Sequence, residues 1–130
     1  MSDEIPKYTG EIYLVTSDAS KEVIERAQEA GINEVFAKTG SQRLDDLFTK
    51  QGRRNVAVVD DHPLAARGNQ VLLESEGANV VIYFNPLTAL KEIPTHMPAF
   101  DVVFTDNKMP KMTGIELASR LRTGDRSNLP

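Results

Sequence analysis

Acidic side chains directly follow two apolar runs of this sequence. Asp60 and Asp61 come after VAVV (56–59), and Asp106 comes after DVVFT (101–105). A carboxylate can attack a phosphoryl group and form an acyl phosphate when a cation screens the charge on the phosphoryl oxygens. Mg²⁺ suits this role because it prefers oxygen ligands and octahedral geometry. The three carboxylates therefore predict a Mg²⁺-assisted aspartyl-phosphate site.

Two further apolar runs end in residues that could complete such a site. EIYLVT (11–16) ends in Thr16, and EVFAK (34–38) ends in Lys38. A hydroxyl and an ammonium group could contact the phosphoryl oxygens opposite the metal. Each residue alone is weak support, since an Asp-Asp pair is more often a turn or a helix cap, and a strand-end Thr or Lys usually belongs to the surface. The set is much stronger than its members.

The apolar runs alternate with helical patterns along the whole chain. Strands are predicted over 11–16, 34–38, 56–60, 79–84 and 100–105, and helices over 19–30, 41–51, 63–77, 86–93 and 113–121. This alternation predicts an α/β fold, a three-layer sandwich around a five-stranded parallel sheet. Because parallel strands bring their carboxyl ends to one edge, the five candidate side chains should converge there.

Helical spacing also predicts which side chains face the core. Ala27 and Ala30 belong to the inward stripe of the first helix, and Leu64, Val71 and Leu72 are expected to point inward from the helix over 63–77. Met109 and Met112 are expected to pack in the core.

Composition limits the classes of function. At 130 residues and 40% hydrophobic, the chain fits one compact domain. A formal charge of −4 argues against nucleic acid as the main partner, and the absence of cysteine excludes disulfides and thiolate metal sites. No apolar stretch is long enough to span a bilayer, and the first residues lack a signal-peptide pattern, so we expect a soluble cytoplasmic protein.

The motifs around these side chains resemble those of response regulator receiver domains. VVDDH carries the acidic pair, FTDNKMPKMTG the phosphoacceptor signature, LVTS the strand-end hydroxyl and FAKT the lysine. The resemblance implies the flavodoxin/CheY-like fold, with strand order 2-1-3-4-5 in the family's numbering. It implies that Asp106 is phosphorylated, that Asp60, Asp61, Asp106 and the main-chain carbonyl of Lys108 bind Mg²⁺, and that Thr16 and Lys38 contact the phosphoryl group.

The resemblance covers nearly the whole chain only when the two halves are exchanged. Residues 11–52 resemble the family's C-terminal half and residues 55–122 its N-terminal half, so 52–55 would be a new join. A circular permutation within a single receiver-like domain, 1–130, explains this order, because domain termini often lie close together. Alternatively, the chain joins halves of two tandem receivers, and swapping between molecules completes each site.

Two residues depart from the family pattern. Thr39 stands where the family usually has a proline after a cis peptide bond, and Val35 stands where it has a switch aromatic. His62 is expected at the rim of the site and His96 in a loop, neither as a metal ligand.

We therefore hypothesise a receiver that accepts a phosphoryl group on Asp106 from a phosphohistidine and is not otherwise an enzyme. The expected donor is a sensor histidine kinase or a histidine phosphotransfer protein, and residues 19–51 are the expected surface for a downstream partner or a homodimer. The chain is expected to bind neither nucleic acid nor membranes. The rivals are a receiver-like interaction module that is not phosphorylated, and a small phosphatase, which would want a carboxylate where Lys108 stands.

Overall fold

The described residues, 6–37 and 54–125 of a computed structural model, form a five-stranded parallel sheet in the order β2-β1-β5-β3-β4. The strands are β1 (Glu11–Thr16), β2 (Glu34–Ala37), β3 (Asn55–Val59), β4 (Asn79–Tyr83) and β5 (Val102–Asp106). When β3 is counted first, followed by β4, β5, β1 and β2, the order read from the β4 edge is 2-1-3-4-5. The predicted sheet is therefore confirmed.

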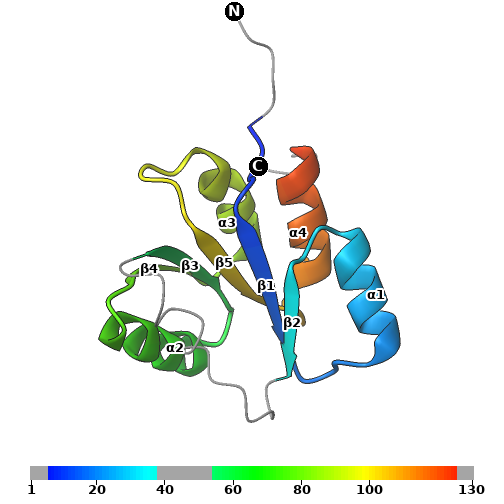
Figure 1. The fold of residues 1–130 in the computed structure, drawn as a ribbon, viewed down its shortest axis with the longest axis horizontal. Helices are drawn as coiled ribbons and strands as arrows, with labels where there is room; N and C mark the ends of the chain where they lie inside the picture. Colours follow the sequence, from blue (N-terminus) through cyan, green and yellow to red (C-terminus); the bar gives the residue numbers. More distant parts are fainter. Residues whose placement is uncertain (1–5, 38–53, 126–130) are drawn as a thin grey trace, which may run out of the picture.

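Helices cover both faces of the sheet (Figure 1). They are α1 (Lys21–Glu29), α2 (Pro63–Ser75), α3 (Pro86–Glu92), which continues into the 3₁₀ turn Ile93–Thr95, and α4 (Gly114–Thr123). Helices α1, α3 and α4 lie on one face and α2 lies on the other. This arrangement is the predicted three-layer sandwich; the helix predicted over 41–51 lies outside the described residues.

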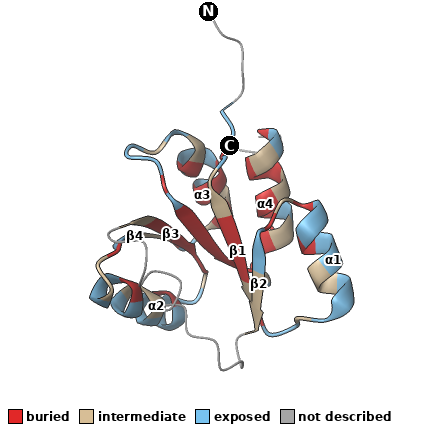
Figure 2. Cartoon of the chain, viewed as in Figure 1, coloured by how far each residue is buried: buried red, intermediate tan, exposed pale blue. Residues whose placement is uncertain are grey.

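Strand alternation explains the two cores. Ile12 and Leu14 of β1 belong to the cluster under α1, α3 and α4, whereas Tyr13 between them belongs to the cluster under α2. The central strand β5 is buried throughout, as Figure 2 shows, because helices cover it on both sides. A continuous apolar run is what such a strand requires, which is why these strands were recognisable in the sequence.

The sequence prediction for α2 was wrong about which side chains face the sheet. Leu64, Val71 and Leu72 are 90%, 67% and 48% exposed, whereas Ala66 and Leu73 are buried. Ala66 and Leu73 are seven residues apart and so lie on the same side of the helix. The small side chain of Ala66 lets the helix lie close to the sheet. Val71 and Leu72, which precede Leu73 in the sequence, then lie on other sides of the helix. Met109 and Met112, by contrast, are buried as predicted.

The N-terminal segment and the end of α4 lie together at the amino ends of the strands (Figure 1). The Tyr8 amide donates to the Leu121 carbonyl (2.9 Å), and the Tyr8 hydroxyl donates to the Phe100 carbonyl (2.9 Å). Arg122 contacts the same segment through hydrogen bonds to the carbonyls of Tyr8 (3.0 Å) and Gly10 (2.6 Å). These bonds join residues 92 or more positions apart, at the sheet edge farthest from the acidic residues.

Candidate functional site

Three of the predicted side chains leave the sheet side by side. The register pairs Val15 with Asp106 and Val59 with Thr105, so Asp60 follows β3 next to Asp106 at the end of β5. Asp60 and Asp106 are each 5% exposed, and Thr16 at the end of β1 is 1% exposed. The convergence predicted from parallel strands is therefore observed for these residues. Lys38 lies outside the described residues.

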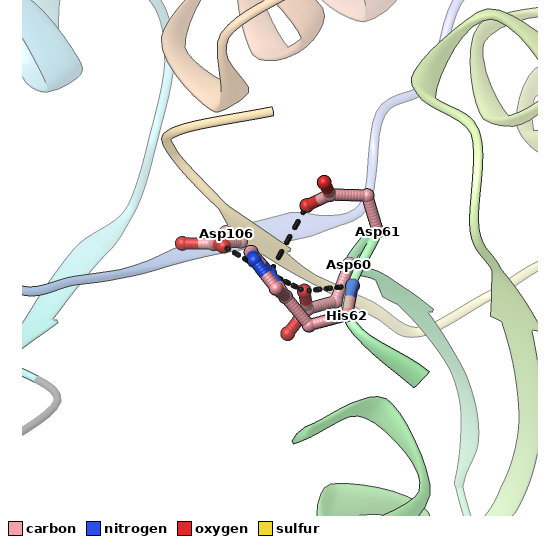
Figure 3. A group of neighbouring side chains, drawn as sticks. All are labelled: Asp60, Asp61, His62 and Asp106. Atoms are coloured by element: carbon pink, nitrogen blue, oxygen red, sulfur yellow. Dashed lines mark hydrogen bonds and ion pairs between the residues drawn. The ribbon is translucent and has the colours of Figure 1, made fainter. Parts of the chain in front are cut away.

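The acidic side chains surround the imidazole ring of His62 (Figure 3). His62 Nδ1 lies 3.2 Å from Asp60 Oδ1, 3.2 Å from Asp61 Oδ1 and 3.8 Å from Asp106 Oδ2. One donor atom from each of these four residues lies within 4.8 Å of the other three. The side chain of His62 is 63% exposed, so the ring covers the cluster from the solvent side.

The sequence interpretation placed His62 at the rim of the site, and its 63% exposed side chain does lie there, but the closeness of its ring to three carboxylates was not foreseen. The residue is the N-cap of α2, with extended backbone, and Pro63 begins the helix. Its amide donates to Asp60 Oδ1 (2.9 Å), which turns the chain back over the strand end. The sequence Asp-Asp-His-Pro could have indicated this position of the His62 main chain. A residue between a strand end and a proline in the first turn of a helix lies beside the last residues of the strand.

Thr16 presents its hydroxyl to the same edge. Its Oγ1 accepts a hydrogen bond from the Asp18 amide (3.1 Å) and donates to the Asp18 carbonyl (3.4 Å). The second distance is long, so little is lost when the hydroxyl turns toward another acceptor. The Asp18 carboxylate accepts from the Ser20 amide (3.1 Å) and so orders the start of α1.

Hydrogen bonds of Asn107 fix the loop between Asp106 and α4. Asp106 Oδ1 accepts from the Asn107 amide (2.8 Å), and the Asn107 carbonyl and side chain accept from Gly114 and Ile115. Thr113 caps α4 by accepting from the Glu116 amide (3.1 Å). A Cβ on Gly114 would clash with the main-chain oxygen of Asp106, so only glycine permits this contact.

An open hollow of about 610 Å³ lies over these groups. Its lining residues are Thr16, Ser17, Asp61, His62, Asp106, Lys108, Met109, Pro110 and Thr113. The hollow gives a phosphoryl-sized group access to Asp106 from solvent. Lys108 is at its edge, and the role of its carbonyl as a metal ligand stays a prediction.

The donor set fits a divalent cation. Carboxylate oxygens of Asp60, Asp61 and Asp106 are the ligands that Mg²⁺ prefers, and Asp61 Oδ1 is buried without a hydrogen bond among the described residues. Three carboxylates this close repel one another unless a cation or a proton lies among them. A metal contacting Asp61 Oδ1 would satisfy that atom and reduce the repulsion.

Comparisons with known proteins bear on this site. The family described as response regulator receiver domain matches residues 56–130, which include the three aspartates and exclude Thr16 and Lys38. The hybrid signal transduction histidine kinase E of Dictyostelium discoideum is 37% identical over 76 residues, covering 58% of this chain and 4% of that protein. No solved structure matches. Within the described residues, no helix is both long and apolar enough to cross a membrane.

Proposed function

Because this chain belongs to the response regulator receiver domain family and is thus a receiver of a two-component signalling system, we propose that Asp106 is its phosphoacceptor and that Mg²⁺ assists the transfer. One observation carries the proposal above the others. The Asp106 carboxylate is 5% exposed, lies within 4.8 Å of the Asp60 and Asp61 donor atoms, and lines a hollow open to solvent. A buried carboxylate with access from one side suits in-line attack.

Each residue has a distinct part in the transfer. The Asn107 amide holds Asp106 Oδ1, so the carboxylate is already oriented before a donor arrives. An Asp106 oxygen would attack the phosphorus of a phosphohistidine while the phosphorus–nitrogen bond breaks and the departing imidazole takes up a proton. Thr16 would donate its hydroxyl to a phosphoryl oxygen, and Lys38 would supply a cation. Mg²⁺ held by Asp60, Asp61, Asp106 and the Lys108 carbonyl would screen the negative charge that gathers there.

The donor we propose is a histidine kinase or a histidine phosphotransfer protein. The similar Dictyostelium protein is, by name, a hybrid histidine kinase. This chain spans 4% of that protein's length, so the kinase activity of the relative is not carried over. We propose that the chain catalyses only its own phosphorylation and dephosphorylation, and that residues 19–51 form its partner surface. Its cytoplasmic location stays a prediction from the sequence.

The halves of the domain are proposed to be circularly permuted within one chain, 1–130. Two observations support this order: Thr16 from the first half and Asp106 from the second line one hollow, and Tyr8 bonds to Leu121 where the permutation would open the chain. If instead two chains exchange halves, phosphorylation should depend on protein concentration. Phosphorylation that stays constant on dilution, with a monomeric mass in solution, is the expected result.

The phosphoacceptor is tested by adding Mg²⁺ and beryllofluoride and recording amide NMR spectra. We expect the largest shifts around Asp106 and Thr16, and no beryllofluoride response in Asp106→Asn. Asp18→Asn is the matched control, because Asp18 lies at the same edge but does not line the hollow. If the wild-type chain does not respond to beryllofluoride but still binds a partner, the unphosphorylated interaction module is favoured. That module is the main rival because Val35 stands where the family has a switch aromatic.

A further inference from the structure

The His62 ring occupies a position that the proposed phosphorylation chemistry does not use. Its Nδ1 lies 3.2 Å from one oxygen of Asp60 and 3.2 Å from one oxygen of Asp61, and 3.8 Å from Asp106 Oδ2. The contact with Asp60 is a hydrogen bond of the metal-free site, and the same nitrogen also lies near the other two carboxylates. The distances therefore raise the question of what Nδ1 binds there.

The spacing of these atoms is that of ligands around one small cation. Zn²⁺ and similar ions bind nitrogen and oxygen at about 2.0–2.2 Å, which puts adjacent ligands about 2.8–3.1 Å apart in an octahedron and about 3.3–3.6 Å apart in a tetrahedron. The two distances of 3.2 Å lie between these values. The 3.8 Å distance to Asp106 Oδ2 would shorten with a small movement of the exposed ring.

The backbone holds the main chain of His62 beside the strand ends. The His62 amide donates to Asp60 Oδ1 (2.9 Å), and Pro63 restricts the following turn. The side chain makes no capping hydrogen bond to α2, so helix formation does not require the imidazole. The ring can therefore exchange its contact with Asp60 for a metal ion without loss of a helix cap.

We propose that His62 Nδ1 is a fourth protein ligand of the cation site for transition-metal ions, and that it raises the affinity of the site for Co²⁺ and Zn²⁺ without raising its affinity for Mg²⁺. The inference rests on the proposed function, since the cation is the one that Asp60, Asp61 and Asp106 would hold. Imidazole nitrogen is a common ligand of zinc, nickel and copper ions, whereas Mg²⁺ prefers oxygen ligands. His62 would thus contribute to the binding of these ions and not to that of Mg²⁺.

The test compares metal affinities of the untagged chain and its His62→Ala variant by calorimetry. We expect the variant to lose about tenfold or more in Co²⁺ and Zn²⁺ affinity, the scale on which metal-site substitutions act, while Mg²⁺ affinity stays within about twofold. Mg²⁺ binding also shows that the variant is folded. His96→Ala is the matched control, because it removes the other histidine, whose ring stacks on Phe100 away from the cluster.

A direct readout comes from the ring itself. Nitrogen NMR of the histidine side chains with Zn²⁺ should shift Nδ1 of His62 and leave both nitrogens of His96 unchanged. Equal Co²⁺ affinity in wild type and His62→Ala, or equal losses for Co²⁺ and Mg²⁺, would overturn the inference.

The two proposals fail in different ways. If beryllofluoride still perturbs Asp106 while His62→Ala leaves Co²⁺ binding intact, the ligand role of His62 is wrong and the phosphoacceptor stands. If Co²⁺ binding needs His62 but beryllofluoride has no effect, the ligand role is supported and the phosphoacceptor proposal fails.

Discussion

The two members of the acidic pair differ in their surroundings. Asp60 is buried, and its Oδ1 accepts from the His62 amide, so it holds the start of α2 as well as facing the cluster. The Asp61 side chain is 23% exposed, and its Oδ1 is buried without a hydrogen bond among the described residues. Asp61 therefore adds charge to the cluster and contributes little to the fold.

Replacing Asp61 should stabilise the metal-free protein. In Asp61→Ala we expect the free energy of unfolding to rise by about 1 kcal/mol or more, because like charges less than 5 Å apart repel at least that strongly. Mg²⁺ affinity should fall in the same variant, so the stability gain should disappear when Mg²⁺ saturates the wild type. Urea unfolding with and without Mg²⁺ measures both effects. Asp60→Ala is the comparison and should destabilise, and unchanged Mg²⁺ affinity in Asp61→Ala would contradict the ligand assignment.

Two buried tyrosines beside Phe100 show what a buried hydroxyl contributes to stability with and without a hydrogen-bond partner. The Tyr83 hydroxyl has no partner among the described residues, whereas the Tyr8 hydroxyl donates to the Phe100 carbonyl (2.9 Å). Tyr83→Phe should leave stability unchanged or raise it by about 1 kcal/mol, since it removes a desolvated polar group. Tyr8→Phe should cost about 1 kcal/mol, since it leaves a carbonyl unpaired. Urea unfolding of both variants checks this; equal losses would show that the Tyr83 hydroxyl has a partner such as water.

At the scale of elements, the position of α4 depends on one glycine. A Cβ at Gly114 would clash with the Asp106 main-chain oxygen and approach Leu14 Cδ1 to 2.8 Å. In Gly114→Ala the helix must move away from β5, and the overpacking should cost about 1–3 kcal/mol and weaken beryllofluoride binding. Gly68→Ala on α2 is the matched control, because its Cβ would meet nothing within 4 Å. It should gain about 0.5–1 kcal/mol from helix propensity. Thermal unfolding measures both, and similar changes in the two variants would refute the contact argument.

The strands were predictable from the sequence and the face of α2 was not. Continuous apolar runs identify strands covered on both sides, and parallel strands place their end residues at one edge, so Thr16, Asp60 and Asp106 could be brought together without a structure. In α2, Val71, Leu72 and Leu73 are equally apolar, and only packing against β3 and β4 selects Leu73. The position of His62 depends on a side-chain torsion above the sheet, which no periodicity encodes.

At the scale of the whole molecule, all three tyrosines should resist ionisation. Burial raises the pKa of Tyr13 to about 12 and raises the pKa values of Tyr8 and Tyr83 from 10.0. Because the folded pKa values exceed the unfolded value, the folded state holds its protons above pH 10, and its stability should fall as the pH rises from 10 toward 12. Tyrosinate absorbance at pH 10 should be clearly less than half developed in the native chain and half developed in urea. Half development in the native chain at that pH would mean that these rings are exposed.

Arg122 joins the two described ends of the molecule. Its guanidinium donates five hydrogen bonds, to the carbonyls of Tyr8, Gly10 and Gly31 and to the Asn33 side chain. All five donors of the group are used within the protein, so the residue serves to hold the chain together. If the permutation opens the chain here, this cluster does noncovalently what a continuous loop would otherwise do.

Lysine cannot replace the Arg122 guanidinium, because a single ammonium group reaches fewer carbonyls. In Arg122→Lys we expect a loss of about 1.5–3 kcal/mol in the free energy of unfolding, the range for hydrogen bonds to charged groups. The Tyr8 amide, which donates to Leu121, should exchange with deuterium faster, while amides of β3 keep their protection. Arg67→Lys on the exposed surface of α2 is the control and should change stability by less than about 0.5 kcal/mol. If Arg122→Lys is as stable as that control, the hydrogen bonds of Arg122 add no measurable stability. The N-terminal segment would then be held to the end of α4 by Tyr8 alone.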